Sequence, residues 1–225
     1  MTSSFDSIAE KYDRWFESPE GQAIFATELD CLRSLCPEFR GRWIEIGVGT
    51  GRFASALGIQ EGIDPSSPML AIAEKRGIRV TPGSAENLPF QESAFNGILL
   101  ALALCFVNNA ERTLSECHRI LIPSGRLLLG IIPADGPWGR EYIAKARGGH
   151  SVYSQARFRT VAETLESAKS HGFKLTASAS ALFWPPHQKP PPQPDVTAGI
   201  VADAGFLGLL FERKSDILQN AGENP

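Results

Sequence analysis

The sequence lacks the marks of an exported or membrane protein. Residues 1–6 contain neither a basic start nor an apolar core, so we expect no secretory signal. The longest apolar run, residues 97–107, is too short to span a bilayer. A formal charge of −3 gives no electrostatic reason to expect a nucleic acid or an anionic membrane as the main partner. We therefore predict a cytoplasmic protein, monomer or homodimer, without a nucleic-acid partner or a membrane span.

Cysteine is also scarce. Cys31, Cys36, Cys105 and Cys117 follow no zinc-ligand spacing and include no C-x-x-C pair. We interpret them as reduced, buried thiols and predict no metal site. The alternative is that some of them bind a soft metal or metalloid.

Glycine, in contrast, is concentrated at one informative place. A short apolar run, residues 43–46, leads into glycines at positions 47, 49 and 51, and the helix-like stretch 52–57 follows. Glycine permits positive φ and lets a ligand approach the backbone. A helix N-terminus offers unpaired N–H groups and a partial positive charge. The pattern predicts a turn that binds a nucleotide-like ligand, although the third glycine of the dinucleotide fingerprint is replaced by Arg52.

An acidic residue ends the next predicted strand, residues 62–64. A carboxylate at this place can accept hydrogen bonds from both hydroxyls of a ribose. Asp64 follows Gly51 by fewer residues than the ~20 typical of dinucleotide folds, so the helix between them must be about a turn short. The alternative for Asp64 is a solvated turn carboxylate, but its position after a strand favours ribose binding.

Further apolar segments predict five more strands, at residues 78–81, 95–107, 126–132, 173–182 and 206–211. Helical stretches separate most of them. On this periodicity alone we predict one domain over residues 1–225 with a mostly parallel α/β sheet.

Four motifs between residues 40 and 132 resemble those of class I S-adenosylmethionine (SAM) dependent methyltransferases. They are Glu45-x-Gly47-x-Gly49-x-Gly51, Asp64-Pro65-Ser66-Ser67-Pro68-Met69, Gly83-Ser84-Ala85-Glu86-Asn87-Leu88-Pro89-Phe90 and the turn from Arg119 to Leu129. The chain is similar to the type 11 group, which includes ubiquinone/menaquinone C-methyltransferases. The resemblance implies a Rossmann-like, doubly wound sheet of seven strands with an antiparallel last strand and an N-terminal helical cap.

The resemblance also implies SAM as cofactor and a role for each motif. The glycines would hold the methionine and ribose side, with Glu45 supporting the amino group, and Asp64 would bind the ribose. Adenine would lie among Met69, Ser84 and Ala85. Ser84 stands where the family usually has aspartate, so that contact should be weaker. The full expected set is Glu45, Gly47, Val48, Gly49, Gly51, Asp64, Pro65, Met69, Ser84, Ala85, Glu86 and Leu104.

Three other segments carry expectations about substrate access. The spacing of apolar residues in the segment 1–38 predicts two helices. We expect these helices either to cap a sheet edge or to form a lid in which Tyr12 and Trp15 close over a ligand. Residues 133–158, with Trp138, Arg140, Tyr142, His150 and Tyr153, predict a substrate-lid insertion or a plain amphipathic surface helix. Residues 159–218 complete the sheet. Within them, the proline-rich run 184–194 is an exposed connection, a second lid using Trp184 or His187, or a ligand for a proline-binding domain.

The resemblance implies methyl transfer to an oxygen, nitrogen, sulfur or carbon atom of a small molecule. No residue stands out as a general base, and Tyr12, Tyr142, His150 and Tyr153 are weak candidates. Two alternatives stay open. One is a NAD-dependent oxidoreductase. This alternative lacks support, because the sequence has neither the third fingerprint glycine nor a Tyr-x-x-x-Lys set. The other is a non-catalytic SAM-binding or interaction protein, suggested by Ser84 and the proline-rich run.

Overall fold

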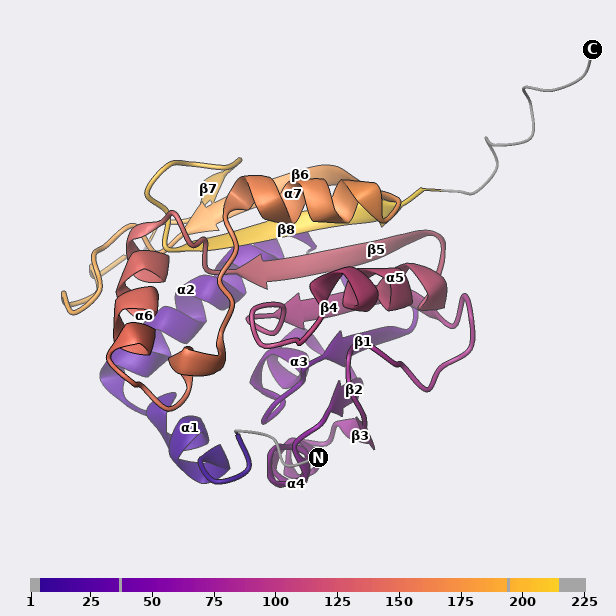
Figure 1. Ribbon diagram of the computed structural model, residues 1–225, viewed down its shortest axis with the longest axis horizontal. Helices are drawn as coiled ribbons and strands as arrows, with labels where there is room; N and C mark the ends of the chain where they lie inside the picture. The colour runs from indigo at the N-terminus through magenta and orange to yellow at the C-terminus, as the bar shows by residue number, and fades with distance from the viewer. Residues whose placement is uncertain (1–4, 37, 194, 215–225) are drawn as a thin grey trace, which may run out of the picture.

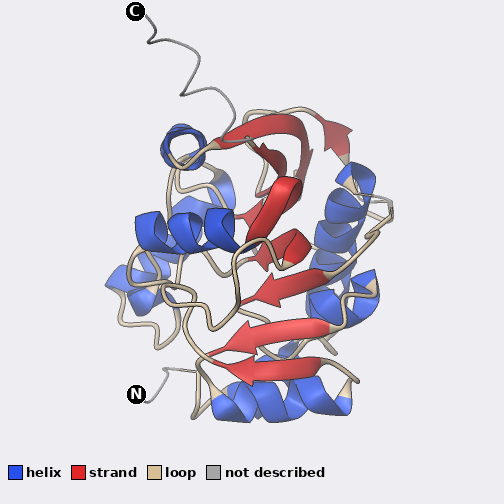
Figure 2. Cartoon of the chain, turned by 90° about the vertical axis from the view of Figure 1, so that its right-hand side faces the viewer, coloured by secondary structure: helices blue, strands red, loops and turns tan. Residues whose placement is uncertain are grey.

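The computed structural model describes residues 5–36, 38–193 and 195–214. The ends of the expected segments 1–38 and 159–218, and the tail beyond them, lie outside these residues. Within the described chain a central sheet is covered by helices on both faces (Figures 1 and 2).

The sheet of the described residues has eight strands in the order β3-β2-β1-β4-β5-β8-β6-β7. Five neighbouring strands are parallel: β1 (Trp43–Ile46), β2 (Glu61–Asp64), β3 (Arg79–Pro82), β4 (Phe95–Ala101) and β5 (Leu121–Ile131). The others are β6 (Phe173–Ala181), β7 (Thr197–Ala198) and β8 (Phe206–Arg213). Since β8 runs opposite to β5 and β6, the predicted mostly parallel sheet with an antiparallel last strand is confirmed. The two-residue β7 adds an edge strand to the predicted seven.

Two apolar layers form the core, one on each face of the sheet. The helices of the described chain are α1 (Ala9–Trp15), α2 (Pro19–Leu35), α3 (Arg52–Leu57), α4 (Ser67–Lys75), α5 (Ala110–Ile120), α6 (Pro137–Arg147), the 3-10 turn η1 (Tyr153–Gln155) and α7 (Val161–Ser170). Buried side chains of α2, α3, α4 and α6 belong to one layer, and those of α5 and α7 to the other. This arrangement is the doubly wound architecture, which leaves the carboxyl ends of the parallel strands open at one edge.

Several helix boundaries follow from local chemistry that the sequence shows. Ser18 begins α2 because its Oγ accepts the N–H of Gly21 at 3.0 Å. Thr160 and Glu163 form a capping box at the start of α7. Gly58 ends the short α3 in the left-handed conformation, with φ of +74°.

The predicted central strand, residues 95–107, is too long: β4 ends at Ala101. Leu102 adopts a left-handed conformation with φ of +57°, and its N–H donates to the carbonyl of Gly130 at 2.8 Å. The chain therefore turns away at Leu102, and residues 103–107 form a loop at the carboxyl edge of the sheet. Among the described helices, none is long and apolar enough to cross a bilayer.

Candidate functional site

Two cavities adjoin at the carboxyl edge of the parallel strands. The first, here called the glycine-turn cavity, has a volume of about 470 Å³ and lies over the ends of β1, β2 and β4. The second, the aromatic cavity, has a volume of about 370 Å³ and is lined in part by residues of α1, α2 and α6. Tyr12, Leu102, Phe106 and Arg157 line both. The strand order reverses between β1 and β4, and ligands of doubly wound folds bind at such a switch point.

The glycine turn needs glycine for two different reasons. Gly47 (φ +73°) packs so tightly that an added Cβ would lie 2.5 Å from the Cβ of Ala103. Gly49 (φ +51°) has no atom within 4 Å of an added Cβ and lines the glycine-turn cavity. Gly47 therefore serves packing, whereas Gly49 leaves backbone open to a ligand.

Asp64 both shapes this turn and faces the cavity. Its Oδ2 accepts the N–H of Gly49 at 2.9 Å, and its Oδ1 accepts the N–H of Ser66 at 2.9 Å. Burial raises the pKa of Asp64, although the two backbone hydrogen bonds oppose that rise. Each carboxylate oxygen has a second lone pair, so two further donors can be accepted from the cavity.

Glu45 lies beneath the turn and does not line the cavity. Its side chain is buried, and its Oε2 accepts the N–H of Ala54 in the first turn of α3 at 2.8 Å. Burial holds the pKa of Glu45 well above its usual range. Any support that it gives to a ligand must therefore pass through the backbone of the turn.

The other expected cofactor residues separate into three groups. Pro65, Met69, Ser84, Ala85 and Glu86 line the glycine-turn cavity together with Gly47, Gly49 and Asp64. Val48 and Gly51 pack inside the protein, against Gly62 and Ala73 respectively. Leu104 lines the aromatic cavity instead.

Glu86 is committed to the protein itself, because its Oε1 accepts the N–H groups of Asn108 and Asn109 at 2.7 and 3.3 Å. Sequence reasoning missed Phe5, Gln155 and Arg157, which also line the glycine-turn cavity. No local motif marks these three residues, because the fold brings them from the two lid segments.

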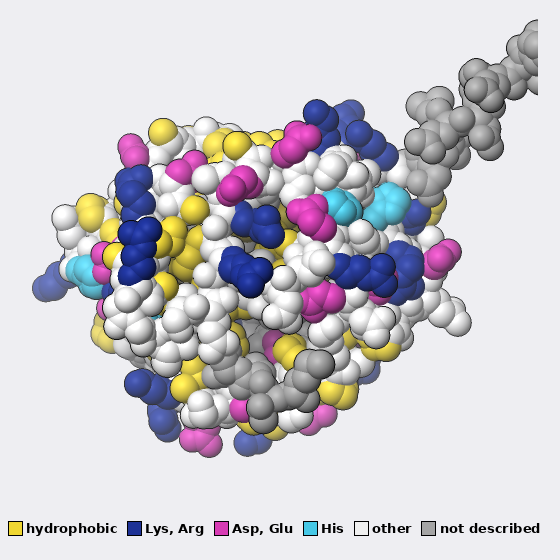
Figure 3. Space-filling model, viewed as in Figure 1, with side chains coloured by type: hydrophobic (Ala, Val, Ile, Leu, Met, Phe, Trp, Pro, Cys, Tyr) yellow, Lys and Arg dark blue, Asp and Glu magenta, His cyan; other side chains and the backbone are white. Residues whose placement is uncertain are grey.

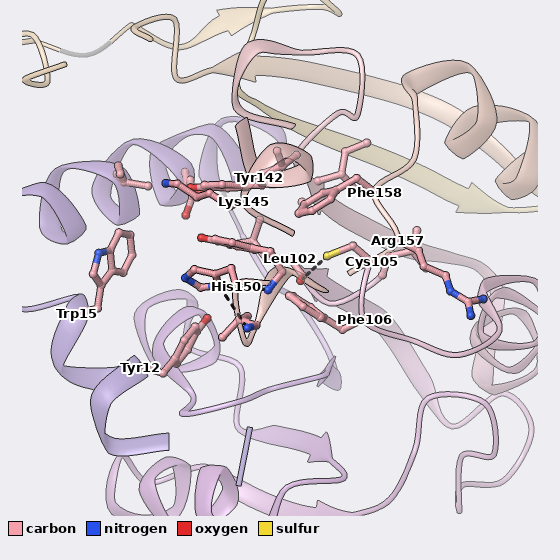
Figure 4. Close-up of a pocket in the computed structure, with 18 of the residues that line it drawn as sticks. Tyr12, Trp15, Leu102, Cys105, Phe106, Tyr142, Lys145, His150, Arg157 and Phe158 are labelled. Atoms are coloured by element: carbon pink, nitrogen blue, oxygen red, sulfur yellow. Dashed lines mark hydrogen bonds between the residues drawn. The ribbon is translucent and has the colours of Figure 1, made fainter. Parts of the chain in front are cut away.

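The aromatic cavity collects all four weak catalytic candidates. Figure 4 shows Tyr12, Tyr142 and His150 directed toward the same space. The rings of Tyr142 and Tyr153 are stacked with centroids 4.3 Å apart, and His150 stacks on Tyr153 at 4.6 Å. Burial raises the pKa of Tyr12, Tyr142 and Tyr153, so these phenols stay protonated at neutral pH.

Several polar or aromatic residues of the later segments line neither cavity. Trp138 is buried and donates its Nε1–H to the carbonyl of Trp184 at 2.8 Å, so both tryptophans belong to the core. His187 of the proline-rich run lies 2.8 Å from Oε1 of Glu141 on α6. Arg140 is exposed and donates to the carbonyl of Asp135. The proline-rich run is thus attached to α6 away from the two cavities.

One cysteine lines the aromatic cavity. Burial raises the pKa of Cys105 to about 12, which keeps it a protonated thiol. The other three cysteines are buried elsewhere and form no disulfide. Within residues 5–36, 38–193 and 195–214, no group of three or more His, Cys, Asp or Glu side chains is placed to hold a metal ion.

Comparisons with known proteins agree with this geometry. A family model described as a methyltransferase domain matches residues 44–129. A crystal structure from Thermotoga maritima, described as a "SAM-dependent methyltransferase, possible histamine N-methyltransferase", superimposes with a TM-score of 0.86 and 36% identity. The match covers 94% of this chain and 99% of that chain.

Two curated relatives extend the comparison. An uncharacterized protein of Mycobacterium tuberculosis is 39% identical over 204 residues, which are 89% of this chain and 70% of that protein. A demethylmenaquinone methyltransferase of Thermotoga maritima is 33% identical over 136 residues, or 56% of this chain and 58% of that protein. By its fold and by these matches, the chain belongs to the class I, type 11 family of SAM-dependent methyltransferases.

Proposed function

We propose that this protein transfers the methyl group of SAM, bound in the glycine-turn cavity, to a small-molecule nucleophile in the aromatic cavity. The observation that carries the proposal is the contact of the two cavities at Tyr12, Leu102, Phe106 and Arg157. Donor and acceptor would meet at this shared wall, which is the arrangement that direct transfer requires.

The residues of the glycine-turn cavity fit SAM. Gly49 leaves space where a side chain would stand, and the remaining lone pairs of Asp64 suit the two ribose hydroxyls. Met69 and Ala85 offer apolar surface and a backbone N–H for adenine, and the hydroxyl of Ser84 can accept from its amino group. When bound, SAM supplies a methyl group that its sulfonium makes electrophilic.

The remaining task of the protein is to position the two molecules and exclude water. Tyr12 of α1 and Phe106 of the loop after β4 place aromatic rings at the junction of the cavities. Leu102 holds the backbone there in its left-handed conformation, supported by the hydrogen bond to Gly130. The aromatic and aliphatic part of this junction would desolvate a nucleophile and so favour transfer over hydrolysis.

A small acceptor is supported by the size and lining of the aromatic cavity. Its volume of about 370 Å³ is within the range of small-molecule sites. Of the two Thermotoga maritima proteins, one is described as a "possible histamine N-methyltransferase" and the other is named a demethylmenaquinone methyltransferase. We place the activity in the cytoplasm, with the protein acting as a monomer or homodimer and without a nucleic-acid partner.

Calorimetry with S-adenosylhomocysteine (SAH) and with NADH tests the cofactor. We expect SAH to bind and NADH not to bind; the reverse result would favour the oxidoreductase alternative. Labelled SAM is then incubated with a panel of small alcohols, phenols, thiols, amines and enols. SAH binding without label transfer to any acceptor would favour the non-catalytic alternative.

A further inference from the structure

A buried acidic residue of α2 lines the aromatic cavity without a partner. Glu28 is only 2% exposed, and its side chain lines this cavity. Within the part of the chain that the structure describes, the side chain of Glu28 takes part in no hydrogen bond and no ion pair. Buried carboxyl groups in proteins are normally paired or hydrogen-bonded, because leaving one bare costs free energy. The arrangement therefore points to a partner that is not part of the protein.

The neighbours of Glu28 do not supply that partner. Tyr12 of α1, Tyr142 of α6 and Tyr153 of η1 are close enough for its charge to raise the pKa of each phenol. Cys31, on the same helix, is affected in the same way. These groups are neutral at physiological pH, so none can balance a negative charge.

Basic side chains also line the aromatic cavity, and as whole residues they are more exposed than Glu28, although Nε of Arg159 is buried without a hydrogen-bond partner. Lys11 and Arg157 are exposed, and Arg159 is half-buried. Lys145 is half-buried and lies 3.5 Å from Glu141, its own acidic partner. Figure 3 shows Lys and Arg side chains beside hydrophobic surface on the face that it presents. Figure 4 shows the guanidinium group of Arg157 directed away from Tyr142. No ion pair joins any described cation to Glu28.

We propose that Glu28 recognises the methyl acceptor, and that the acceptor is a small molecule with a primary or secondary amine on an apolar or aromatic body. This inference rests on the proposed methyl transfer. The carboxylate would bind the ammonium form of the amine through a charge-assisted hydrogen bond. The apolar body would pack against Phe158 and Leu104, which line the same cavity.

Glu28 also has the proton affinity that such an acceptor requires. An ammonium ion has no lone pair and cannot attack a methyl group. Burial raises the pKa of Glu28 to about 8, so its carboxylate can take one proton from the bound ammonium. The freed nitrogen lone pair then forms the N–CH₃ bond while the S–CH₃ bond breaks, and its electron pair stays on sulfur. The product leaves as a methylated ammonium ion, and the proton passes from Glu28 to water.

The binding step makes a prediction that does not depend on turnover. In the free protein at about pH 7 Glu28 is mostly protonated, and the free amine is protonated as well. The ion pair of carboxylate and ammonium contains one proton fewer than the two separate partners. Binding must therefore release about one proton to the buffer. Binding of an alcohol or a carboxylic acid of the same shape should not be accompanied by proton release.

The test uses SAH-saturated protein and calorimetry in phosphate and in Tris, whose ionisation enthalpies differ. The probes are 2-phenylethylamine and hexylamine, each with its matched alcohol and carboxylate. We expect the amines to bind best, with release of about one proton per site. Glu28→Gln should weaken amine binding about tenfold or more and abolish the proton release, while SAH binding is unchanged. Glu20→Gln, on an exposed position of the same helix, should behave as the wild type.

Different failures have different meanings. Loss of SAH binding by the wild type would overturn the proposed function itself. Normal SAH binding with no preference for amines, or with the same amine affinity in Glu28→Gln, would overturn only the role of Glu28. Should the Gln variant melt far below the wild type, Glu28→Asp keeps the charge, and it must then still prefer each amine to its alcohol.

Discussion

The carboxylate of Asp13 in α1 accepts a hydrogen bond from Nε of Arg52 in α3 at 2.8 Å. Its second oxygen accepts from Nη2 of Arg76, at the end of α4, also at 2.8 Å. Arg76 in turn donates to the carbonyl of Thr50 in the glycine turn. Through these contacts α1, which carries Tyr12, is attached to the two helices that begin at the carboxyl edge of the parallel strands. The first helix of the predicted lid is therefore tied to the glycine turn.

Asp13→Asn is expected to loosen α1, because it leaves two partly buried arginines without their carboxylate. We expect weaker SAH binding and a loss of about 1–3 kcal/mol in the free energy of unfolding at neutral pH. Calorimetry and urea denaturation measure the two effects. Asp30→Asn is the control, since Asp30 is exposed and lies 4.0 Å from its arginine. Equal stability of both variants would contradict the assigned role.

The pH dependence of this effect has a definite sign. Burial acts to raise the pKa of Asp13, but hydrogen bonds from Arg76 and Arg52 outweigh it and lower the pKa overall. The folded state thus binds the proton less readily than the unfolded state. The stabilisation by Asp13 is complete above the unfolded pKa of about 3.9 and is lost as the pH falls through the lower folded value. The difference between wild type and Asp13→Asn should shrink accordingly in acid.

A pair of glycines on either side of α3 allows ligand binding to be distinguished from backbone strain. Gly49 and Gly58 both have positive φ, and no atom lies within 4 Å of an added Cβ at either position. Alanine at either position should lower the free energy of unfolding by about 1 kcal/mol, because a residue with a Cβ disfavours the left-handed conformation. Only Gly49→Ala places a methyl group against the glycine-turn cavity. We expect similar denaturation midpoints for the two variants, but a loss of SAH affinity in Gly49→Ala alone. Parallel losses of affinity would contradict the proposed site.

Asp64→Ala should weaken SAH binding by about tenfold, because charge-assisted hydrogen bonds to the ribose are lost. The substitution also removes the acceptors for the Gly49 and Ser66 N–H groups. A loss of affinity alone therefore does not show whether the ribose contact or the shape of the turn is responsible. A second measurement resolves this. The wild type should prefer 5′-methylthioadenosine to its 2′-deoxy analogue, and the variant should bind both equally. A preference that survives in Asp64→Ala would remove the ribose assignment. Glu74→Ala, exposed on α4, is the matched control.

Glu28→Gln should stabilise the protein increasingly as the pH rises. The folded pKa of Glu28, about 8, lies above the unfolded value, so the unfolded chain gives up this proton first. The burial penalty of Glu28 is absent in acid, grows above about pH 4.5 and is complete above about pH 8. Thermal melts at about pH 5 and pH 8 should therefore show the larger gain for the Gln variant at the higher pH. A gain that does not change with pH would contradict a raised pKa.

The sheet and the glycine-turn cavity were predictable because their determinants are local in sequence. Gly49 follows the short strand β1 and Asp64 ends the short strand β2, and parallel strands bring their carboxyl ends to one edge. The end of β4 was not predictable. Residues 95–107 form one apolar run, and the turn at Leu102 depends on a hydrogen bond to Gly130, a residue of the neighbouring strand.

Glu28 also escaped sequence reasoning, although a signal for it exists. It lies four residues after Ile24 and four before Leu32, on the apolar stripe of α2 rather than on its solvent face. An acidic residue within such a stripe indicates a buried charge that needs a partner. Which cavity it lines is decided only by α1, α6 and residues 150–159, which fold over it from distant parts of the chain.

Tyr12 lines both cavities, so in the proposed reaction its ring would set the separation of the two ligands. A substitution that enlarges the room for an acceptor also alters the space beside the sulfonium. Selection for a new acceptor at this position would be accompanied by a change in how firmly the methyl donor is held.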